Sequence, residues 1–255
     1  MTQSTLQPKV DVRRSAERDA TRISWLDSKH SFSFGRNYDP ANTHHGLLLV
    51  NNDDLVTPGA GFETHPHKDM EIVTWVLQGS LVHQDSTGHS GIIYPGLAQR
   101  MSAGRGILHS EKNDSWRLEG ATHKEPVHFI QMWVVPDEER ITPGYEQLEI
   151  ADELLSGGLV PVASGMEAHD GAAAIRIKNK YAALHAARLR PGQSVELPDA
   201  PYLHLFVARG AVTLEGAGNL AEGDAVRFTA TGGQRVTATE PAEVLVWEMH
   251  ATLAG

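Results

Sequence analysis

The chain has 255 residues, a formal charge of −10 with its 14 histidines uncharged, and no cysteine. This charge disfavours a nucleic-acid binder that neutralises phosphates with clustered Lys and Arg, and the lack of cysteine excludes disulfides, thiolate metal ligands and a cysteine nucleophile. The length fits one large domain or two modest ones, and any metal ion must be bound through nitrogen and oxygen.

No segment of the sequence predicts targeting or membrane insertion. Met1 to Arg14 lacks the apolar core of a signal peptide, and no later stretch approaches the run of about 18 apolar residues that a membrane-spanning helix requires. We therefore expect a cytoplasmic protein with no membrane contact and no direct contact with nucleic acid.

Short strands and turns alternate through the first half of the chain. Ser31 to Gly35 alternates polar and apolar residues, as a half-buried strand does, and the polar run Asn51 to Asp54 indicates a turn after an apolar strand. Glu71 to Leu77 predicts a strand buried on both faces, and Val127 to Val135 predicts a long strand. This rhythm is typical of an all-β barrel or sandwich.

The rhythm is interrupted once and then returns. Residues 137–171 are rich in acids and glycine, and we interpret them as a connector with one or two helical turns. Aligning Gly210 with Gly79 sets Leu203 to Gly210 against Ile72 to Gly79, which is a faint internal repeat. We predict two β-barrels, over residues 1–136 and 172–255.

Two histidine motifs stand out in the first half, His65-Pro66-His67 and His109-Ser110-Glu111. Alternate side chains of an extended strand point to one face, so each motif presents two potential ligands on one side. Two such pairs can converge on a single ion. Glu71 is a rival carboxylate, because it shares the face of His65 and His67 if the strand continues unbroken to it.

The spacing around these motifs resembles the two motifs of the cupin superfamily, with Gly104 where the second motif usually has proline. The match is more specific to the pirin family, and it runs densely from Trp25 to Val135. The residues that carry it include His30 to Phe34, Asn52 to Asp54, His65 to Glu71, Val76 to Gly79 and Gln99 to Glu111.

This resemblance implies a bicupin, an all-β chain of two β-barrels in which only the N-terminal barrel binds a metal. The implied ligands are His65, His67, His109 and Glu111, and the implied ion is iron(II), with Ni, Co, Mn, Cu or Zn as alternatives. Imidazole and carboxylate suit these ions. In the repeat alignment, His65 and His67 fall on Glu196 and Pro198, so we expect the second barrel to lack a metal site.

The resemblance also implies an activity, the opening of a flavonol such as quercetin by dioxygen, as in quercetin 2,3-dioxygenase. Glu111 is then the candidate catalytic residue, accepting the proton of the substrate hydroxyl. The alternative is a regulatory protein that binds a metal and acts through a protein partner. Phe62, Trp75, Gln99 and Met101 are candidates for the cavity wall or for plain core, His83 is expected to be a hydrogen-bonded barrel histidine, and His204 to be structural.

Overall fold

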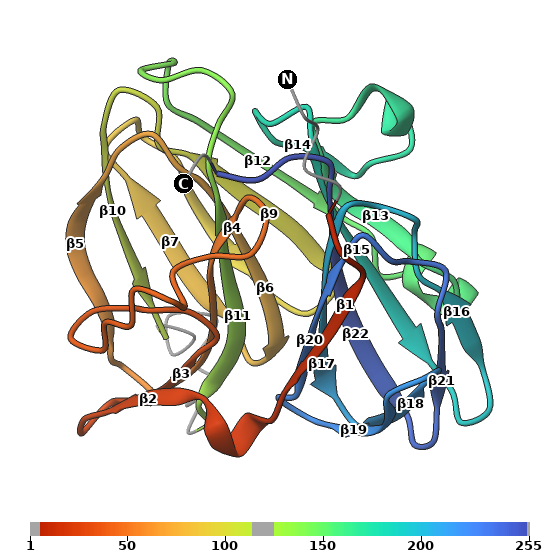
Figure 1. The fold of residues 1–255 in the computed structure, drawn as a ribbon. Helices are drawn as coiled ribbons and strands as arrows, with labels where there is room; N and C mark the ends of the chain where they lie inside the picture. The colour runs from red at the N-terminus through yellow and green to blue at the C-terminus, as the bar shows by residue number, and fades with distance from the viewer. Residues whose placement is uncertain (1–5, 114–124, 254–255) are drawn as a thin grey trace.

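The computed structural model describes residues 6–113 and 125–253 and shows two β-barrels that pack side by side (Figure 1). The chain is nearly all β, and within these two ranges it forms no α-helix, only the short 3-10 helices η1 (Ser15–Glu17), η3 (Glu153–Ser156) and η4 (Glu167–His169). Each barrel consists of one seven-stranded and one four-stranded sheet. The prediction of an all-β bicupin is confirmed.

The first barrel holds both histidine motifs. Its large sheet has the strand order β12 (Gly144–Glu149), β9 (Leu97–Ser102), β6 (Glu71–Gln78), β11 (Val127–Val134), β4 (Leu48–Val56), β3 (Leu26–His30) and β2 (Asp19–Arg22). Its small sheet has the order β5 (Gly61–His67), β10 (Ile107–Lys112), β7 (Leu81–Asp85) and β8 (Ser90–Ile93).

The second barrel repeats this plan. Its large sheet has the order β1 (Lys9–Arg13), β20 (Ala225–Thr229), β17 (Tyr202–Arg209), β22 (Ala242–Met249), β15 (Ala182–Leu189), β13 (Val160–Ser164) and β14 (Ile175–Arg176). Its small sheet has the order β16 (Ser194–Glu196), β21 (Arg235–Ala238), β18 (Ala211–Leu214) and β19 (Gly218–Ala221). The strands β6 and β17 are each followed by a glycine of positive φ, Gly79 and Gly210, as the repeat alignment implies.

Three strands cross the simple division of the chain into two halves. The N-terminal strand β1 pairs with β20, so it completes the large sheet of the second barrel. Within the range expected to be a connector, β12 joins the first barrel beside β9 and β13 joins the second beside β15. The connector therefore contributes to both sheets, and it also contains the two 3-10 turns η3 and η4.

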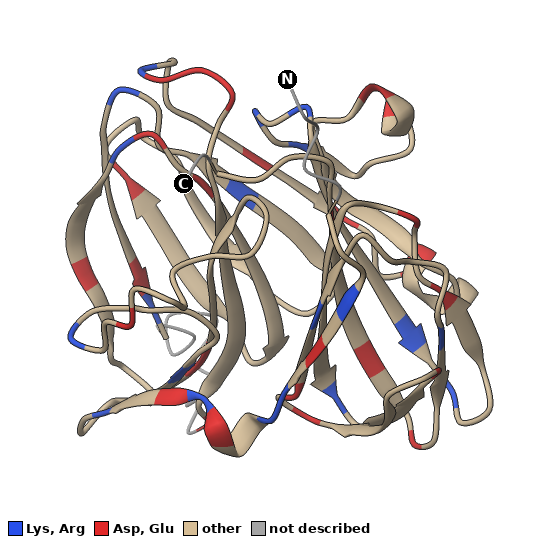
Figure 2. Ribbon diagram, in the orientation of Figure 1, with Lys and Arg blue, Asp and Glu red and all other residues tan. Residues whose placement is uncertain are grey.

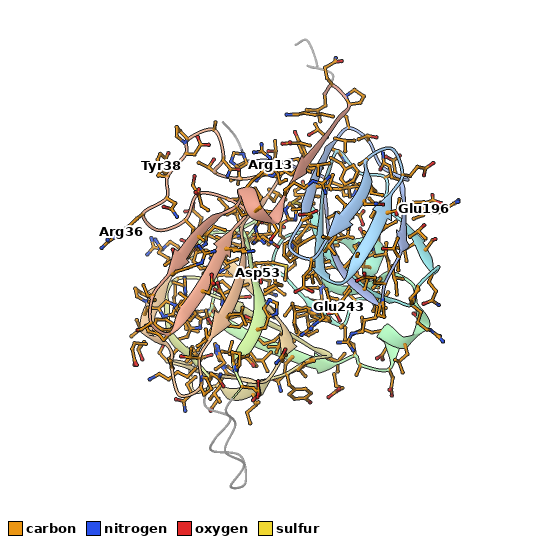
Figure 3. The ribbon with its side chains drawn as sticks, turned by 90° about the horizontal axis from the view of Figure 1, so that it is seen from below. Arg13, Arg36, Tyr38, Asp53, Glu196 and Glu243 are labelled. Atoms are coloured by element: carbon orange, nitrogen blue, oxygen red, sulfur yellow. The ribbon has the colours of Figure 1, made fainter. Side chains whose placement is uncertain are left out.

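The strand β6 is buried on both faces, as its apolar sequence predicts. Val73, Trp75 and Leu77 face a core shared with the second barrel, where they lie in one cluster with residues such as Trp247. The indole nitrogen of Trp75 donates a hydrogen bond to Glu243 of the second barrel. In the view from below, Asp53 of the first barrel and Glu243 of the second lie near the line where the barrels meet (Figure 3).

The interior of the first barrel is layered. Thr74 of β6 pairs with Gln99 of β9 on one side and Gln131 of β11 on the other, so three polar side chains lie in register across the large sheet. One apolar cluster contains Ile72 and lies to one side of this polar layer, and another contains Val76 and lies to the other side. The small sheet with the histidine motifs closes over it.

Two local predictions are wrong, and both concern the segment before and within β4. The strand expected at Ser31 to Gly35 is absent, because β3 ends at His30 and the chain turns so that Ser33 and Asp39 hydrogen-bond each other. The turn expected at Asn51 to Asp54 lies inside β4, where these polar side chains find partners; Asn52, for example, bonds His30 at 3.0 Å.

Charged side chains are distributed over both barrels, with Lys and Arg interspersed among Asp and Glu (Figure 2). Among the described residues, no helix is long and apolar enough to cross a membrane.

Candidate metal centre

Antiparallel pairing of β5 with β10 brings together three of the ligand candidates, His65, His67 and His109. His109 lies directly opposite His65, and Ile107 lies opposite His67. Residues opposite each other in such a pair point to the same face, as do residues two apart on one strand. His65, His67 and His109 therefore share one face of the small sheet.

Glu111 lies on the same face because the β-bulge of this strand pair is in β5 and leaves β10 regular. Glu63 and Thr64 of β5 lie opposite the single residue Ser110 of β10, so the extra residue is on β5 and β10 stays regular. Along β10 the residues Ile107, His109 and Glu111 are buried while Leu108 is exposed. His109 and Glu111, the two potential ligands of the second motif, therefore both point into the barrel interior.

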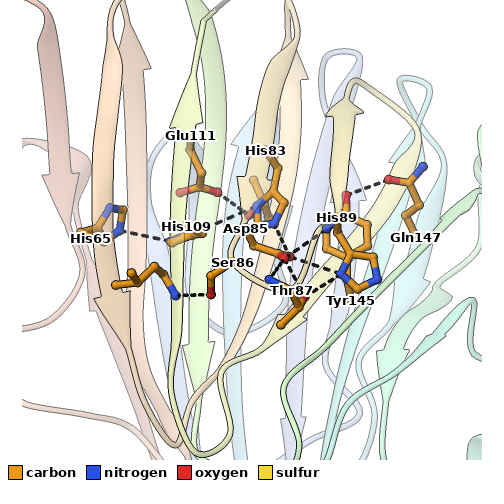
Figure 4. A network of polar contacts seen from close by, with 12 residues as sticks. His65, His83, Asp85, Ser86, Thr87, His89, His109, Glu111, Tyr145 and Gln147 are labelled. Atoms are coloured by element: carbon orange, nitrogen blue, oxygen red, sulfur yellow. Dashed lines mark hydrogen bonds and ion pairs between the residues drawn. The ribbon is translucent and has the colours of Figure 1, made fainter.

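The three imidazole rings form a compact group (Figure 4 shows two of them, His65 and His109). The Nε2 atoms of His65 and His109 are 3.1 Å apart. Ring centroids are 4.5 Å apart for His65 and His109, and 4.8 Å for His67 with each of the other two. One nitrogen of each ring lies within 4.8 Å of one nitrogen of the others, which is the spacing that ligands of one ion have.

The tautomers of two of these rings follow from their hydrogen bonds. Nδ1 of His65 lies 2.7 Å from the carbonyl oxygen of Glu63, and because a carbonyl only accepts, Nδ1 carries the proton and Nε2 a lone pair. Nδ1 of His109 lies 3.4 Å from Nδ1 of His83, whose Nε2 lies 3.1 Å from Oδ2 of Asp85.

The Asp85 carboxylate sets the direction of this second chain. Burial raises the pKa of Asp85, but hydrogen bonds from Thr87, His83 and His89 outweigh it and lower the pKa to about 2. The carboxylate thus accepts from Nε2–H of His83, and Nδ1 of His83 accepts in turn from Nδ1–H of His109 (Figure 4). His109 is left with its Nε2 lone pair directed at His65.

His67 completes the group. Its Nε2 is buried and has no hydrogen-bond partner among the described residues, while its ring packs edge-on against Trp133 with centroids 4.9 Å apart. Burial and the neighbouring histidines lower the pKa of His67 to about 4 and that of His109 to about 3, so both rings are neutral at pH 7. Neutral imidazole lone pairs that face one another repel unless a cation lies between them.

Glu111 is buried and held by two donors from the polar layer. Nε2 of Gln131 donates to Oε2 at 2.7 Å, and Oγ1 of Thr74 lies 3.4 Å from Oε1. A carboxylate oxygen of Glu111 lies within 4.8 Å of a ring nitrogen of both His109 and His83. Of the three ring ligands, the carboxylate therefore shares this spacing with His109, and its less firmly held oxygen is Oε1.

Glu71 is directed elsewhere. The strand that carries His65 and His67 ends at His67, the backbone bends at Asp69 with φ of 47°, and Glu71 begins β6 in the other sheet. Its Oε2 accepts from Oγ of Ser102 at 2.9 Å and from the backbone nitrogen of Lys178 at 3.0 Å. The unbroken strand that would make it a rival ligand does not exist.

Sequence reasoning missed the support of the site. Thr74 and Gln131 carry no local sequence signal, and the signal for Asp85 is that it lies two residues from His83, the same spacing as in the ligand motifs. Of the residues considered for the cavity wall, Trp75 lies on the opposite face of β6, in the core shared by the barrels, and Met101 packs with Ile72.

Two surface hollows give access to β5 from solvent. One of about 430 Å³ is lined by residues that include His67 and Ile107, and one of about 450 Å³ is lined by residues that include Phe62 and His65. His65 and His67 are partly exposed, whereas His109 and Glu111 are buried. A small molecule thus meets the group from the side of β5.

Comparisons with known proteins agree with this geometry. A model of the Pirin family matches residues 10–134, and a model described as the quercetinase C-terminal cupin domain matches residues 162–249. The chain is 65% identical, over 96% of each chain, to a Mycobacterium tuberculosis protein that is named, as a provisional assignment, a quercetin 2,3-dioxygenase. It is 36% identical to the quercetin 2,3-dioxygenase of Escherichia coli K12, over 94% of this chain and 98% of that one.

Solved structures show the same fold over the whole length. YhhW of Escherichia coli superposes with a TM-score of 0.84 at 32% identity, covering 97% of this chain and all of the other. A second structure of YhhW, a bacterial pirin in complex with nickel(II), superposes with a TM-score of 0.83 at 33% identity, over 96% of this chain. Because the Pirin model matches residues 10–134 and relatives above 30% identity cover nearly the whole chain, this chain belongs to the pirin family.

Proposed function

We propose that the protein is a metal-dependent dioxygenase that opens a flavonol such as quercetin, with one divalent transition-metal ion held by His65, His67, His109 and Glu111. The observation that carries the proposal is the close approach of one nitrogen from each of three imidazole rings. In His65 and His109 the hydrogen bond of Nδ1 leaves Nε2 with a lone pair, and these two Nε2 atoms are 3.1 Å apart. The names of the relatives support the reaction, and the nickel complex of YhhW supports a divalent ion.

The donor set fits iron(II) as well as nickel, cobalt and manganese, since all accept imidazole and carboxylate ligands. Four protein ligands leave positions open on an ion that prefers six. Glu111 is favoured over Glu71 as the fourth ligand because it adjoins His109, whereas Glu71 is bonded to Ser102 and Lys178.

The ion, when bound, supplies Lewis acidity that lowers the pKa of a phenolic hydroxyl next to it. Glu111 is the proposed acceptor of that proton. Gln131 donates to its Oε2 at 2.7 Å and orients the carboxylate, while Oε1, whose contact to Thr74 is 3.4 Å, is the oxygen available to a proton.

The layers of the barrel protect such a reaction from water. Apolar side chains, among them Ile72 and Ile107 on one side and Val76 and Phe129 on the other, flank the polar layer that faces Glu111. Excluding water strengthens the interaction of charges within the site.

The activity is tested with full-length protein stripped by chelator and reloaded with iron(II), nickel, cobalt or manganese. We expect aerobic consumption of quercetin with release of carbon monoxide in at least one metal form. Metal-free protein and a His65→Ala/His67→Ala variant are the controls and should be inactive. If every reloaded form leaves quercetin unchanged, the proposed reaction is wrong.

The fourth ligand is tested by metal content. We expect Glu111→Ala to lose most of its bound metal after dialysis, because it removes a charged ligand, while Glu71→Ala keeps the metal of the unaltered protein. Metal analysis of both variants, with circular dichroism as the check on folding, decides between them. Full metal retention in Glu111→Ala would contradict the assignment.

A further inference from the structure

A second group of metal-type ligands lies in the other barrel, far along the chain from the first. His169 of η4, His185 of β15 and Glu248 of β22 each offer a ligand atom, and these atoms lie within 4.8 Å of one another. Nε2 of His185 is 2.9 Å from Oε2 of Glu248, and Nε2 of His169 is 4.0 Å from the same oxygen. The two imidazole rings meet edge to face with centroids 5.1 Å apart.

Antiparallel pairing of β15 with β22 brings two of the three together. Val246 lies opposite His185, and Ala183 lies opposite Glu248, so His185 and Glu248 are diagonal neighbours on the same face of the sheet. Further along that face, Ala187 and Val244 belong to the apolar core of the second barrel. The polar pair occupies the end of this core, where η4 adds His169.

Two of the three potential ligands, His169 and Glu248, are oriented by a further side chain. Nδ1 of His169 lies 3.0 Å from Oγ of Ser164, whose oxygen can accept the ring proton and leave Nε2 with a lone pair. Oγ of Ser164 also accepts from the backbone nitrogen of Met166 at 3.0 Å, which fastens the turn. The second oxygen of Glu248 lies 2.8 Å from Nε2 of His250. Outer partners of this kind are what orient ligands at known metal sites.

We propose that His169, His185 and Glu248 bind a second divalent transition-metal ion, with His250 and Ser164 as positioning residues. Two imidazoles and one carboxylate suit zinc, cobalt, nickel or iron(II), whereas calcium and magnesium prefer oxygen ligands alone. Three protein ligands leave at least one position for water or another small ligand. This site does not depend on the proposed dioxygenase activity.

The charge state of the group favours a cation. Glu248 supplies a carboxylate whose two oxygens face imidazole nitrogens, Oε1 with Nε2 of His250 at 2.8 Å and Oε2 with Nε2 of His185 at 2.9 Å. The side chains of His169 and His250 are 18% and 34% exposed, so an ion can enter from solvent.

The location explains why sequence comparison with the first site predicts no metal in this barrel. That comparison examines the counterparts of His65 and His67, which are Glu196 and Pro198 on or next to β16. The second group uses β15 and β22 instead, which pair in the large sheet as β4 and β11 do in the first barrel. The two sites are therefore not equivalent positions of the repeat.

The test uses zinc as the probe and full-length protein freed of metal by chelator. We expect two zinc ions per chain in the unaltered protein, one in His65→Ala/His67→Ala, one in His169→Ala/His185→Ala, and none in the combined variant. His44→Ala, which alters a histidine outside every such group, is the matched control and should keep two. Metal content after gel filtration gives these numbers, and circular dichroism checks folding.

A cobalt(II) absorption spectrum of His65→Ala/His67→Ala adds a second readout, because a site of low coordination number gives visible bands that are stronger than, and shifted from, the weak band of hydrated cobalt. We expect His250→Ala in this background to keep the site but bind cobalt about 10- to 100-fold more weakly. One ion per chain in the unaltered protein would overturn the proposal. So would a folded His65→Ala/His67→Ala variant that binds no ion, or His169→Ala/His185→Ala that still binds two.

Discussion

In His109 the ring proton is on Nδ1, and this leaves Nε2 with the lone pair that a metal ligand needs. Its Nε2 faces His65 because its Nδ1 donates to His83, and His83 is held by Asp85. Replacing Asp85 by asparagine should change this arrangement. Oδ1 already accepts backbone N–H groups of Thr87 and His89, so an amide would place its nitrogen toward His83.

The change Asp85→Asn tests this chain of hydrogen bonds. The amide oxygen must stay on the side of Thr87 and His89, so the NH₂ group faces His83 and donates to its Nε2. His83 then carries its proton on Nδ1 and donates to His109, which moves the proton of His109 to the ligand atom Nε2. We expect metal affinity to fall about 10- to 100-fold, measured by competition with a chelator.

The matched control is Asp39→Asn, which alters a carboxylate in the turn beside Ser33 and should leave affinity unchanged. Equal affinity in Asp85→Asn and the unaltered protein would show that Asp85 does not set the tautomer of His109.

At the scale of elements, one buried carboxylate holds the N-terminal strand β1 on the second barrel. Asp224 precedes β20 and accepts from the backbone nitrogen of Ser15 at 2.8 Å and from the side chain of Arg14 at 2.8 Å. Burial raises the pKa of Asp224, but these bonds and one from Ala221 outweigh it and lower the pKa below its usual value. The carboxylate thus ties η1 and the end of β1 to the sheet they complete.

We expect Asp224→Ala to lower the free energy of unfolding by about 1–3 kcal/mol, as for the loss of hydrogen bonds to a buried charged group. Since the folded-state pKa is lowered, this stabilisation is present above the unfolded-state pKa of about 3.9 and is lost as pH falls through the folded-state pKa. Urea unfolding should therefore show a full difference at pH 7 and a smaller one below pH 4.

The exposed pair of Asp11 with Arg13 on the same strand supplies the control. Asp11→Ala should cost less than about 1 kcal/mol, as exposed ion pairs do. An Asp224→Ala variant that matches Asp11→Ala at pH 7 would exclude this role for Asp224.

At the scale of the whole molecule, the two barrels share their largest apolar cluster, and so they should unfold together. Trp75 and Met132 of the first barrel and Trp247 of the second all lie in it, and the indole nitrogen of Trp247 lies 3.2 Å from the sulfur of Met132. Neither barrel can keep this face buried once the other is lost.

We expect Trp75→Ala to destabilise the protein by about 3–5 kcal/mol, the cost of removing a large buried side chain, while a single unfolding transition is kept. Differential scanning calorimetry measures both. Leu148→Ala, at a position 50% exposed, is the control and should change stability by less than about 0.5 kcal/mol. Two separate transitions in the unaltered protein would contradict the shared core.

The sequence by itself determined the all-β rhythm, the two barrels and the ligand motifs, because side-chain alternation along a strand is a local property. His65 and His67, like His109 and Glu111, lie two residues apart, and pairing of β5 with β10 keeps each motif on one face. The turn predicted at Asn51 to Asp54 is wrong because these residues lie inside β4, where Asn52 bonds His30 and Asn51 bonds Ser31.

Only the tertiary structure decided what surrounds those motifs. It directs Glu71 away through a bend at Asp69, aligns Thr74, Gln99 and Gln131 across three strands, and places Asp85 behind His109 through His83. It also assembles His169, His185 and Glu248 from three elements. The physical reason is that strand pairing and chain bends, which bring distant residues together, depend on contacts that no local spacing records.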